Sequence, residues 1–125
     1  KKPKKPVPVR TAKVLLIQSG EQWLWQQRPH SGLWGGLWSL AIIENDVEFN
    51  QLCQSLKLIS TREAVQISHS FTHFTWILNA HIFQIEQDQK EYLQAELGGE
   101  WLTPQKATQM GIPTAMKKLI SAVEV

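Results

Sequence analysis

Two short segments hold most of the residues that could bind a ligand. The first, RPHSGLWGGLWSL at residues 28–40, places one arginine beside three glycines and two tryptophans. Glycine lets a backbone turn tightly and bring its N–H groups up to a phosphate, whereas tryptophan is usually buried. The second, HSFTH at residues 69–73, offers two imidazoles, two hydroxyls and a phenyl ring. The first segment is therefore either a phosphate-binding loop or a packed structural corner.

The two histidines of the second segment, His69 and His73, are four residues apart. On a helix this spacing would place both imidazoles on one face, where they could bind Zn²⁺. The surrounding pattern is that of a hairpin, at whose tip the two rings need not converge, and no cysteine or carboxylate accompanies them. We expect no metal site here. From the residues alone, the simplest interpretation is a solvated hairpin tip anchored by its aromatic rings.

Regular elements must position these two segments. Runs of β-branched and aliphatic residues predict strands, and apolar residues at i, i+3, i+4 and i+7 predict helices. The predicted strands span 9–18, 22–28, 37–43, 62–68, 74–85 and a short stretch from 100, and the predicted helices span 46–57 and 115–123, with a helical turn at Pro104. The order β-β-β-α-β-β-β-α predicts an α+β fold, an α/β/α sandwich in which helices flank a mixed sheet.

Both predicted helices have suitable first residues and one apolar face. Asn45 and Glu48 resemble a capping box before the first helix, and Thr114 is the expected cap of the second. The apolar stripe of the first helix is Phe49, Leu52, Cys53 and Leu56. The inward residues of the second are Ala115, Met116, Leu119, Ile120 and Val123.

Basic residues concentrate at the start of the chain. Six of the thirteen lysines and arginines lie within the first 13 residues, and from Val14 onward seven basic residues stand against eleven acidic ones, a balance of −4. The prolines and lysines of residues 1–8 predict an extended connector, and residues 9–125 are the predicted domain. A basic connector suits a position near phosphates or another domain, although a solubilising linker explains it as well.

The single cysteine, Cys53, excludes an internal disulfide and a multi-cysteine metal cluster within this sequence. No apolar run approaches the roughly 20 residues that cross a bilayer. We therefore expect an intracellular, cytoplasmic monomer with no membrane partner.

The glycine-rich segment, followed by a strand and an amphipathic helix, resembles the Nudix fold. Nudix hydrolases cleave nucleoside diphosphate linkages with Mg²⁺ that carboxylates of this helix hold. When the family signature is laid on Gly36, its apolar positions fall on Leu52 and Leu58. Its glutamate and arginine positions hold Ile42, Asn50, Gln51, Gln54 and Ser55. Such residues supply neither anionic oxygens for Mg²⁺ nor a base for water, so the chain lacks the Nudix catalytic box and we expect no catalytic residue.

Along essentially its whole length the chain is similar to the C-terminal domain of the MutY family of adenine DNA glycosylases. RPHSGLWGGLW resembles the family's Arg-Pro-x-x-Gly-Leu-Trp-Gly-Gly-Leu stretch, and HSFTHF resembles its His-x-Phe-Ser-His-Phe loop. The basic connector and the last helix, PTAMKKLI, also resemble the corresponding segments of that family. The resemblance implies a noncatalytic domain that recognises 8-oxoguanine opposite adenine in base excision repair. Adenine excision and a 4Fe-4S cluster would belong to an N-terminal domain of the parent protein.

The resemblance places Thr72 at the family's serine position, which makes its hydroxyl the expected lesion contact. 8-Oxoguanine has an N7–H donor where guanine has an acceptor, and a new carbonyl at C8; a hydroxyl can accept from the first or donate to the second. Phe71 could wedge beside the base, and His73 could donate to a phosphate or brace the loop. The remaining expected DNA-binding residues are His69, Ser70 and Arg28; the guanidinium of Arg28 could reach phosphate or stack on an indole.

With the carboxylates absent, the glycine-rich segment is interpreted as mainly a structural corner that braces a hairpin. The expected partners are double-stranded DNA containing 8-oxoguanine paired with adenine, and the N-terminal catalytic domain of the same parent. The expected location is the bacterial cytoplasm, with a nucleoid-associated function and no cofactor in this domain. Two alternatives stay open: a nucleotide hydrolase with an altered metal site, and a protein-interaction module, which the six tryptophans favour.

Overall fold

The computed structural model describes residues 8–59 and 62–124. The predicted connector therefore lies outside the described residues except for Pro8, and its boundary stays a prediction. The carbonyl oxygen of Pro8 accepts a hydrogen bond from the backbone N–H of Thr75 at 2.9 Å. This bond places the start of the domain beside a strand from the middle of the chain.

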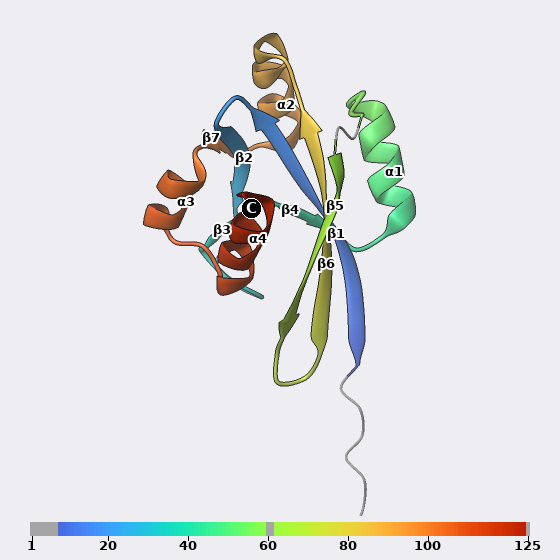
Figure 1. Ribbon diagram of the computed structural model, residues 1–125, viewed down its shortest axis with the longest axis vertical. Coiled ribbons are helices and arrows are strands. Elements are labelled where there is room, and N and C mark those ends of the chain that lie inside the picture. Colours follow the sequence, from blue (N-terminus) through green and yellow to red (C-terminus); the bar gives the residue numbers. More distant parts are fainter. Residues whose placement is uncertain (1–7, 60–61, 125) are drawn as a thin grey trace, which may run out of the picture.

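A mixed sheet forms the centre of the fold (Figure 1). Its strands lie in the order β3-β2-β1-β6-β5, with β4 pairing with β1 and β7 with β2. The long central pair β1 and β6 is parallel, and the other pairs are antiparallel. The strands are β1 (Val9–Ser19), β2 (Gln22–Gln27), β3 (Trp38–Ser39), β4 (Ala41–Ile43), β5 (Arg62–Ser70), β6 (Thr75–Gln84) and β7 (Glu100–Leu102).

Helices cover both faces of this sheet. They are α1 (Asp46–Ser55), the short η1 (Gln87–Gln89), α2 (Lys90–Leu97), α3 (Pro104–Met110) and α4 (Thr114–Glu124). The period of two in β1 divides its side chains: Val14 and Leu16 pack in the core under α3 and α4, whereas Leu15 and Ile17 pack in the core under α1 and α2. The predicted α/β/α sandwich is confirmed. None of the helices in the described part of the chain has the length and apolar character needed to span a membrane.

Two predicted boundaries are wrong. Residues 37–43 form two short strands instead of one, because the chain changes partner at the buried Leu40, after which it pairs with β1 instead of β2. The first predicted helix ends at Ser55, since Leu56 is its C-cap and Lys57 adopts a left-handed φ of +56°.

Helical content is also higher than predicted. η1 and α2 occupy all of residues 87–97, where only Leu93 is buried, so no long apolar stripe in the sequence indicates them. α3 is a helix of 7 residues instead of a single turn. Its N-cap is Thr103, whose hydroxyl accepts from the backbone N–H of Lys106 at 3.2 Å. The last helix begins at Thr114 itself, one residue earlier than expected.

Removing a core side chain of α4 should destabilise the whole domain. Leu119 is fully buried between α4 and the sheet, so Leu119→Ala should lower the free energy of unfolding by about 2–5 kcal/mol. Ser121 is exposed on the same helix, and Ser121→Ala should change that free energy by less than about 0.5 kcal/mol. Urea unfolding followed by tryptophan fluorescence measures both, and equal effects would contradict the packing of α4.

Candidate nucleic-acid interface

The β5–β6 hairpin projects from one end of the sheet (Figure 1). Its strands stay paired as far as Ser70 and Thr75, and the backbone N–H of Phe71 closes the turn by donating to the carbonyl oxygen of Phe74 at 2.7 Å. We call these four residues from Phe71 to Phe74 the tip. The predicted tip at 69–73 is wrong in its bounds, because the regular antiparallel ladder of β5 continues two residues further than the polar sequence indicated.

The tip presents polar groups on an aromatic support. Thr72 and His73 are exposed, as is Ser70 at the end of β5. Phe71 is half-buried, and its ring stacks on that of Phe74 with centroids 4.7 Å apart and 26° between the ring planes. A hydroxyl and an imidazole thus lie on the surface of a turn that a stacked ring pair and a short backbone hydrogen bond hold in place.

Trp34 of the glycine-rich loop makes ring contacts with the hairpin. The centroid of the indole lies 5.4 Å from that of Trp76, 6.1 Å from that of Phe71 and 6.3 Å from that of His69. Trp34 also has a φ of +56°, a left-handed conformation that is uncommon for any residue with a side chain. The large side chain of Trp34 indicated that it would be buried, but nothing in the sequence indicated its contacts with the hairpin.

Four backbone N–H groups of the glycine-rich loop, at its two ends, are used within the protein. The N–H of Arg28 donates to Leu37 at 2.8 Å, and that of Gly36 lies 3.2 Å from the carbonyl oxygen of Arg28. Those of Leu37 and Trp38 donate to carbonyl oxygens of Trp34 and Gly111. A phosphate-binding loop needs such groups free to face the ligand, so the geometry favours the structural corner.

The side chain of Arg28 is half-buried at the start of this loop. Its Nε is buried and has no hydrogen-bond partner among the described residues. The ring contacts that join loop and hairpin come from Trp34. Arg28 thus lies at the start of the glycine-rich loop, and within the described part of the chain no ring contact joins it to the residues of the tip.

His69 belongs to β5, opposite Trp76, and is half-buried in the aromatic contacts. Its ring lies edge-on to that of Phe71 with centroids 4.7 Å apart. Burial, and then the positive charge of Lys118, lower the pKa of His69 below its ordinary value, so the ring is neutral at pH 7. Within residues 8–59 and 62–124, no group of three or more histidine, cysteine or acidic side chains could hold a metal ion.

The positions that carry carboxylates in the Nudix signature lie on the opposite face of the sheet. On α1 these carboxylate positions are exposed and hold Gln51, Gln54 and Ser55, and Asn50 occupies the arginine position before them. Two carboxylates at the start of this helix are in ion pairs: Glu44 with Arg10 at 2.7 Å, and Asp46 with Lys13 at 3.8 Å. α1 therefore presents amides and a hydroxyl to solvent instead of a set of acids.

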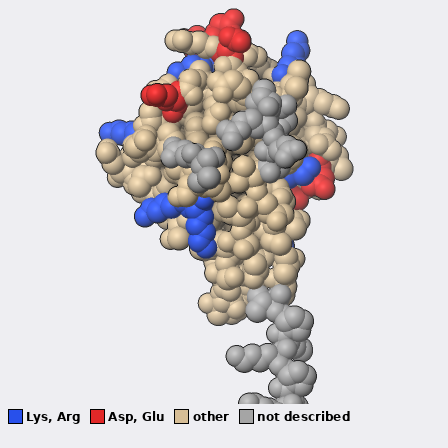
Figure 2. All heavy atoms as spheres, viewed as in Figure 1, with Lys and Arg blue, Asp and Glu red and all other residues tan. Residues whose placement is uncertain are grey.

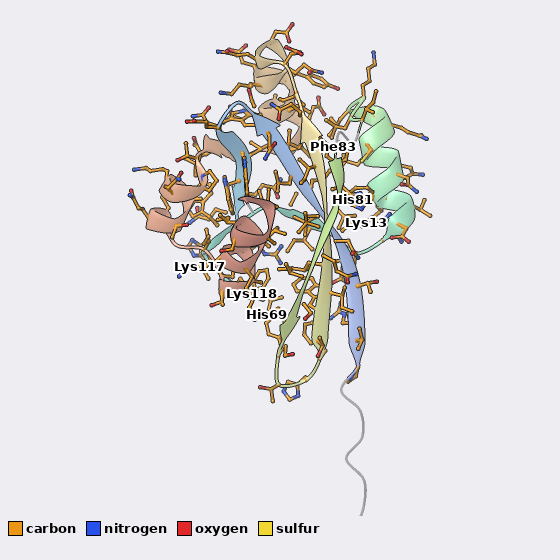
Figure 3. The ribbon with its side chains drawn as sticks, in the orientation of Figure 1. Lys13, His69, His81, Phe83, Lys117 and Lys118 are labelled. Carbon is orange, nitrogen blue, oxygen red and sulfur yellow. The ribbon has the colours of Figure 1, made fainter. Side chains whose placement is uncertain are left out.

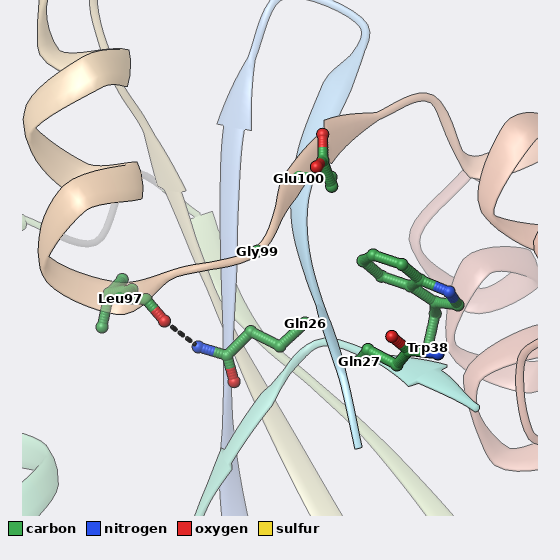
Figure 4. Close-up of a pocket in the computed structure, with 6 residues that line it drawn as sticks. All are labelled: Gln26, Gln27, Trp38, Leu97, Gly99 and Glu100. Carbon is green, nitrogen blue, oxygen red and sulfur yellow. Dashed lines mark hydrogen bonds between the residues drawn. The ribbon is translucent and has the colours of Figure 1, made fainter. Parts of the chain in front are cut away.

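An open pocket of about 510 Å³ lies between β2, β3 and the α2–β7 connection (Figure 4). It is lined by Gln26, Gln27, Trp38, Leu97, Gly99 and Glu100. The side-chain amide of Gln26 donates to the carbonyl oxygen of Leu97 at 2.7 Å, so this amide joins two walls of the pocket. None of the predicted DNA-binding residues lines it.

Comparison with known proteins agrees with this architecture. A family model described as NUDIX domain matches residues 13–122. A curated adenine DNA glycosylase from Mus musculus is 28% identical over 109 residues, which cover 78% of this chain and 21% of that protein. The chain thus spans about a fifth of the length of this relative.

Two solved structures share the fold. The C-terminal domain of mouse MUTYH, crystallised in complex with human PCNA, matches with a TM-score of 0.67 and 20% identity, covering 91% of this chain and 86% of that chain. The MutT protein of methicillin-resistant Staphylococcus aureus 252, described as a Nudix hydrolase, matches with a TM-score of 0.61 and 14% identity, covering 93% and 98%. The predicted Nudix-like fold and the resemblance to the MutY family are confirmed.

A side chain at Gly35 should disrupt the glycine-rich loop. A Cβ there would overlap the carbonyl oxygen of His30, whereas Gly32 has open space around it and only its φ of +94° opposes a side chain. Gly32→Ala, the matched control, should cost about 1–2 kcal/mol of unfolding free energy. Gly35→Ala should cost about 1–3 kcal/mol more, as measured by urea denaturation. A smaller loss at Gly35 than at Gly32 would contradict the packed corner.

Proposed function

Because this chain belongs to the NUDIX domain family and carries no carboxylates at the positions of the catalytic box, we propose that it is a noncatalytic recognition domain of an adenine DNA glycosylase. The domain reads 8-oxoguanine paired with adenine. An N-terminal domain of the same parent, which would carry the 4Fe-4S cluster, removes the mispaired adenine. The curated relative, an adenine DNA glycosylase of which the match covers 21%, supports this assignment of the two tasks to two domains.

The exposed Thr72 hydroxyl on the closed tip is the observation that carries the proposal. The turn is already held by the backbone bond and the stacked rings of Phe71 and Phe74. A group that is held in place before binding loses little conformational freedom when it meets its ligand. The hydroxyl can accept from N7–H of the lesion or donate to its O8, and guanine offers neither group.

The neighbouring residues have supporting roles in this proposal. His73 is exposed beside Thr72 and donates to the DNA backbone. Phe71, half-buried and stacked, supports the turn and offers its exposed edge to the base. Ser70 is exposed at the end of β5 and can reach the same strand of DNA. The proposed ligand is duplex DNA.

Removing the hydroxyl should reduce discrimination. Thr72→Ala should lose about 1–3 kcal/mol of the preference for duplexes with 8-oxoguanine over those with guanine. Thr72→Ser keeps the hydroxyl and should retain the preference. Binding of both duplexes is measured by fluorescence anisotropy, with the chain alone and with the chain joined to the helical domain of an adenine DNA glycosylase. An unchanged ratio of affinities in Thr72→Ala would remove Thr72 from the proposal.

Nucleotide hydrolysis is the second candidate, favoured by the structural likeness to a Nudix hydrolase. The amides of Gln51 and Gln54 on α1 should not support it, because they neither bind Mg²⁺ as anions nor activate water. We expect no Mg²⁺-dependent release of phosphate or pyrophosphate from 8-oxo-dGTP, with an active Nudix hydrolase assayed in parallel. Turnover that EDTA abolishes would overturn the noncatalytic assignment.

A further inference from the structure

Two lysines of α4 lie beside the hairpin that carries the tip. Because Met116 and Leu119 of α4 are fully buried against the sheet, Lys117 and Lys118 between them are turned outward and exposed. Figure 3 shows both lysines on the side of the sheet where α4 covers the hairpin, with Lys118 next to His69. We call Lys117 and Lys118 the lysine pair.

The segments of chain around the lysine pair carry no carboxylate. No aspartate or glutamate occurs in residues 64–85, which include most of the hairpin. None occurs in residues 101–123 either, which include α3 and most of α4. Figure 2 shows Lys and Arg atoms above the tapering end of this face, and no Asp or Glu atoms on that end. The acids of β5 and α4, Glu63 and Glu124, therefore lie at the ends of these elements in sequence, outside the segments that flank the lysine pair.

The lysine pair also differs from the basic residues of β1. Arg10 and Lys13 each form an ion pair with a carboxylate that flanks the start of α1. Among the described side chains, neither lysine of the pair forms such an ion pair. Lysine is a compact charge on a flexible stem, which suits a phosphate whose exact position varies.

We propose that the lysine pair binds backbone phosphates of the DNA strand whose base the tip reads. This inference rests on the proposed function and adds a second part to the same interface. His69, beside Lys118, precedes Thr72 by three residues, which is about 10 Å along an extended strand. That span corresponds to about three nucleotides along the axis of one DNA strand. The tip and the lysine pair can therefore contact one strand together.

The tip and the lysine pair have different tasks in this interface. Contacts to phosphates position a protein on a duplex, and contacts to base edges provide the specificity. The predicted domain, residues 9–125, carries nine basic and eleven acidic residues, a balance of −2, so its overall charge does not attract DNA. A local positive face next to the tip gives the domain one favourable orientation. His69 is neutral at pH 7, so the lysines supply the charge there.

The dependence of affinity on salt tests the proposal. The double substitution Lys117→Ala and Lys118→Ala should weaken binding to duplexes with 8-oxoguanine and with guanine by the same factor. The slope of log K against log salt concentration should fall by about 1 for each lysine removed. Lys106→Ala is the matched control: this lysine is exposed on α3, which packs against β2 and β7 instead of the hairpin. An unchanged slope in the double variant, or an equal loss in the control, would overturn the proposal.

This experiment separates the two proposals. If wild-type protein does not prefer the 8-oxoguanine duplex but the double variant loses slope, lesion reading fails and the phosphate site stands. If Thr72→Ala alone changes the preference and the double variant binds like wild type, the phosphate site fails and lesion reading stands.

The position of Lys118 is tested without DNA: Lys118→Ala should raise the pKa of His69 toward its ordinary value in an NMR titration. An unchanged pKa would contradict the geometry.

Discussion

The packing of Trp34 against the β5–β6 hairpin connects the two segments that carry the chemistry of this domain. The indole occupies a left-handed backbone conformation, which costs about 1–2 kcal/mol for a residue with a side chain. Its contacts with His69, Phe71 and Trp76 offset that cost, because burying a large aromatic side chain is strongly favourable. Without this contact, the glycine-rich loop would no longer brace the hairpin that ends in the tip.

The same sheet supports two different surfaces. On one face α1 keeps the place of the Nudix helix, but amides and a hydroxyl stand where the signature has carboxylates, so the helix packs without the ligands of a metal site. At the end of the sheet, the paired strands β5 and β6 hold Thr72 and His73 in a short turn. A scaffold can thus keep its architecture while its exposed polar groups differ from one family member to another.

Much of the fold could be predicted because strands leave a strong signal in sequence. The alternation of Trp76, Leu78, Ala80 and Ile82 is that of a strand with one buried face, and all four are buried. α2 could not be predicted, since a helix that buries only Leu93 has no periodic stripe. Within the candidate site, the polar residues between two strand-like runs indicated that a hairpin tip is present. Its bounds and the contacts of Trp34 depend on register and tertiary packing, which local composition does not encode.

The hydrogen bond between Pro8 and Thr75 determines where the chain enters the domain. Thr75 directly follows the tip, so Pro8 lies at the end of the molecule that bears Thr72. Arg10, two residues later, stacks on the ring of Phe74 at 5.1 Å and is paired with Glu44. A displacement of Pro8 would therefore act first on the base of that turn.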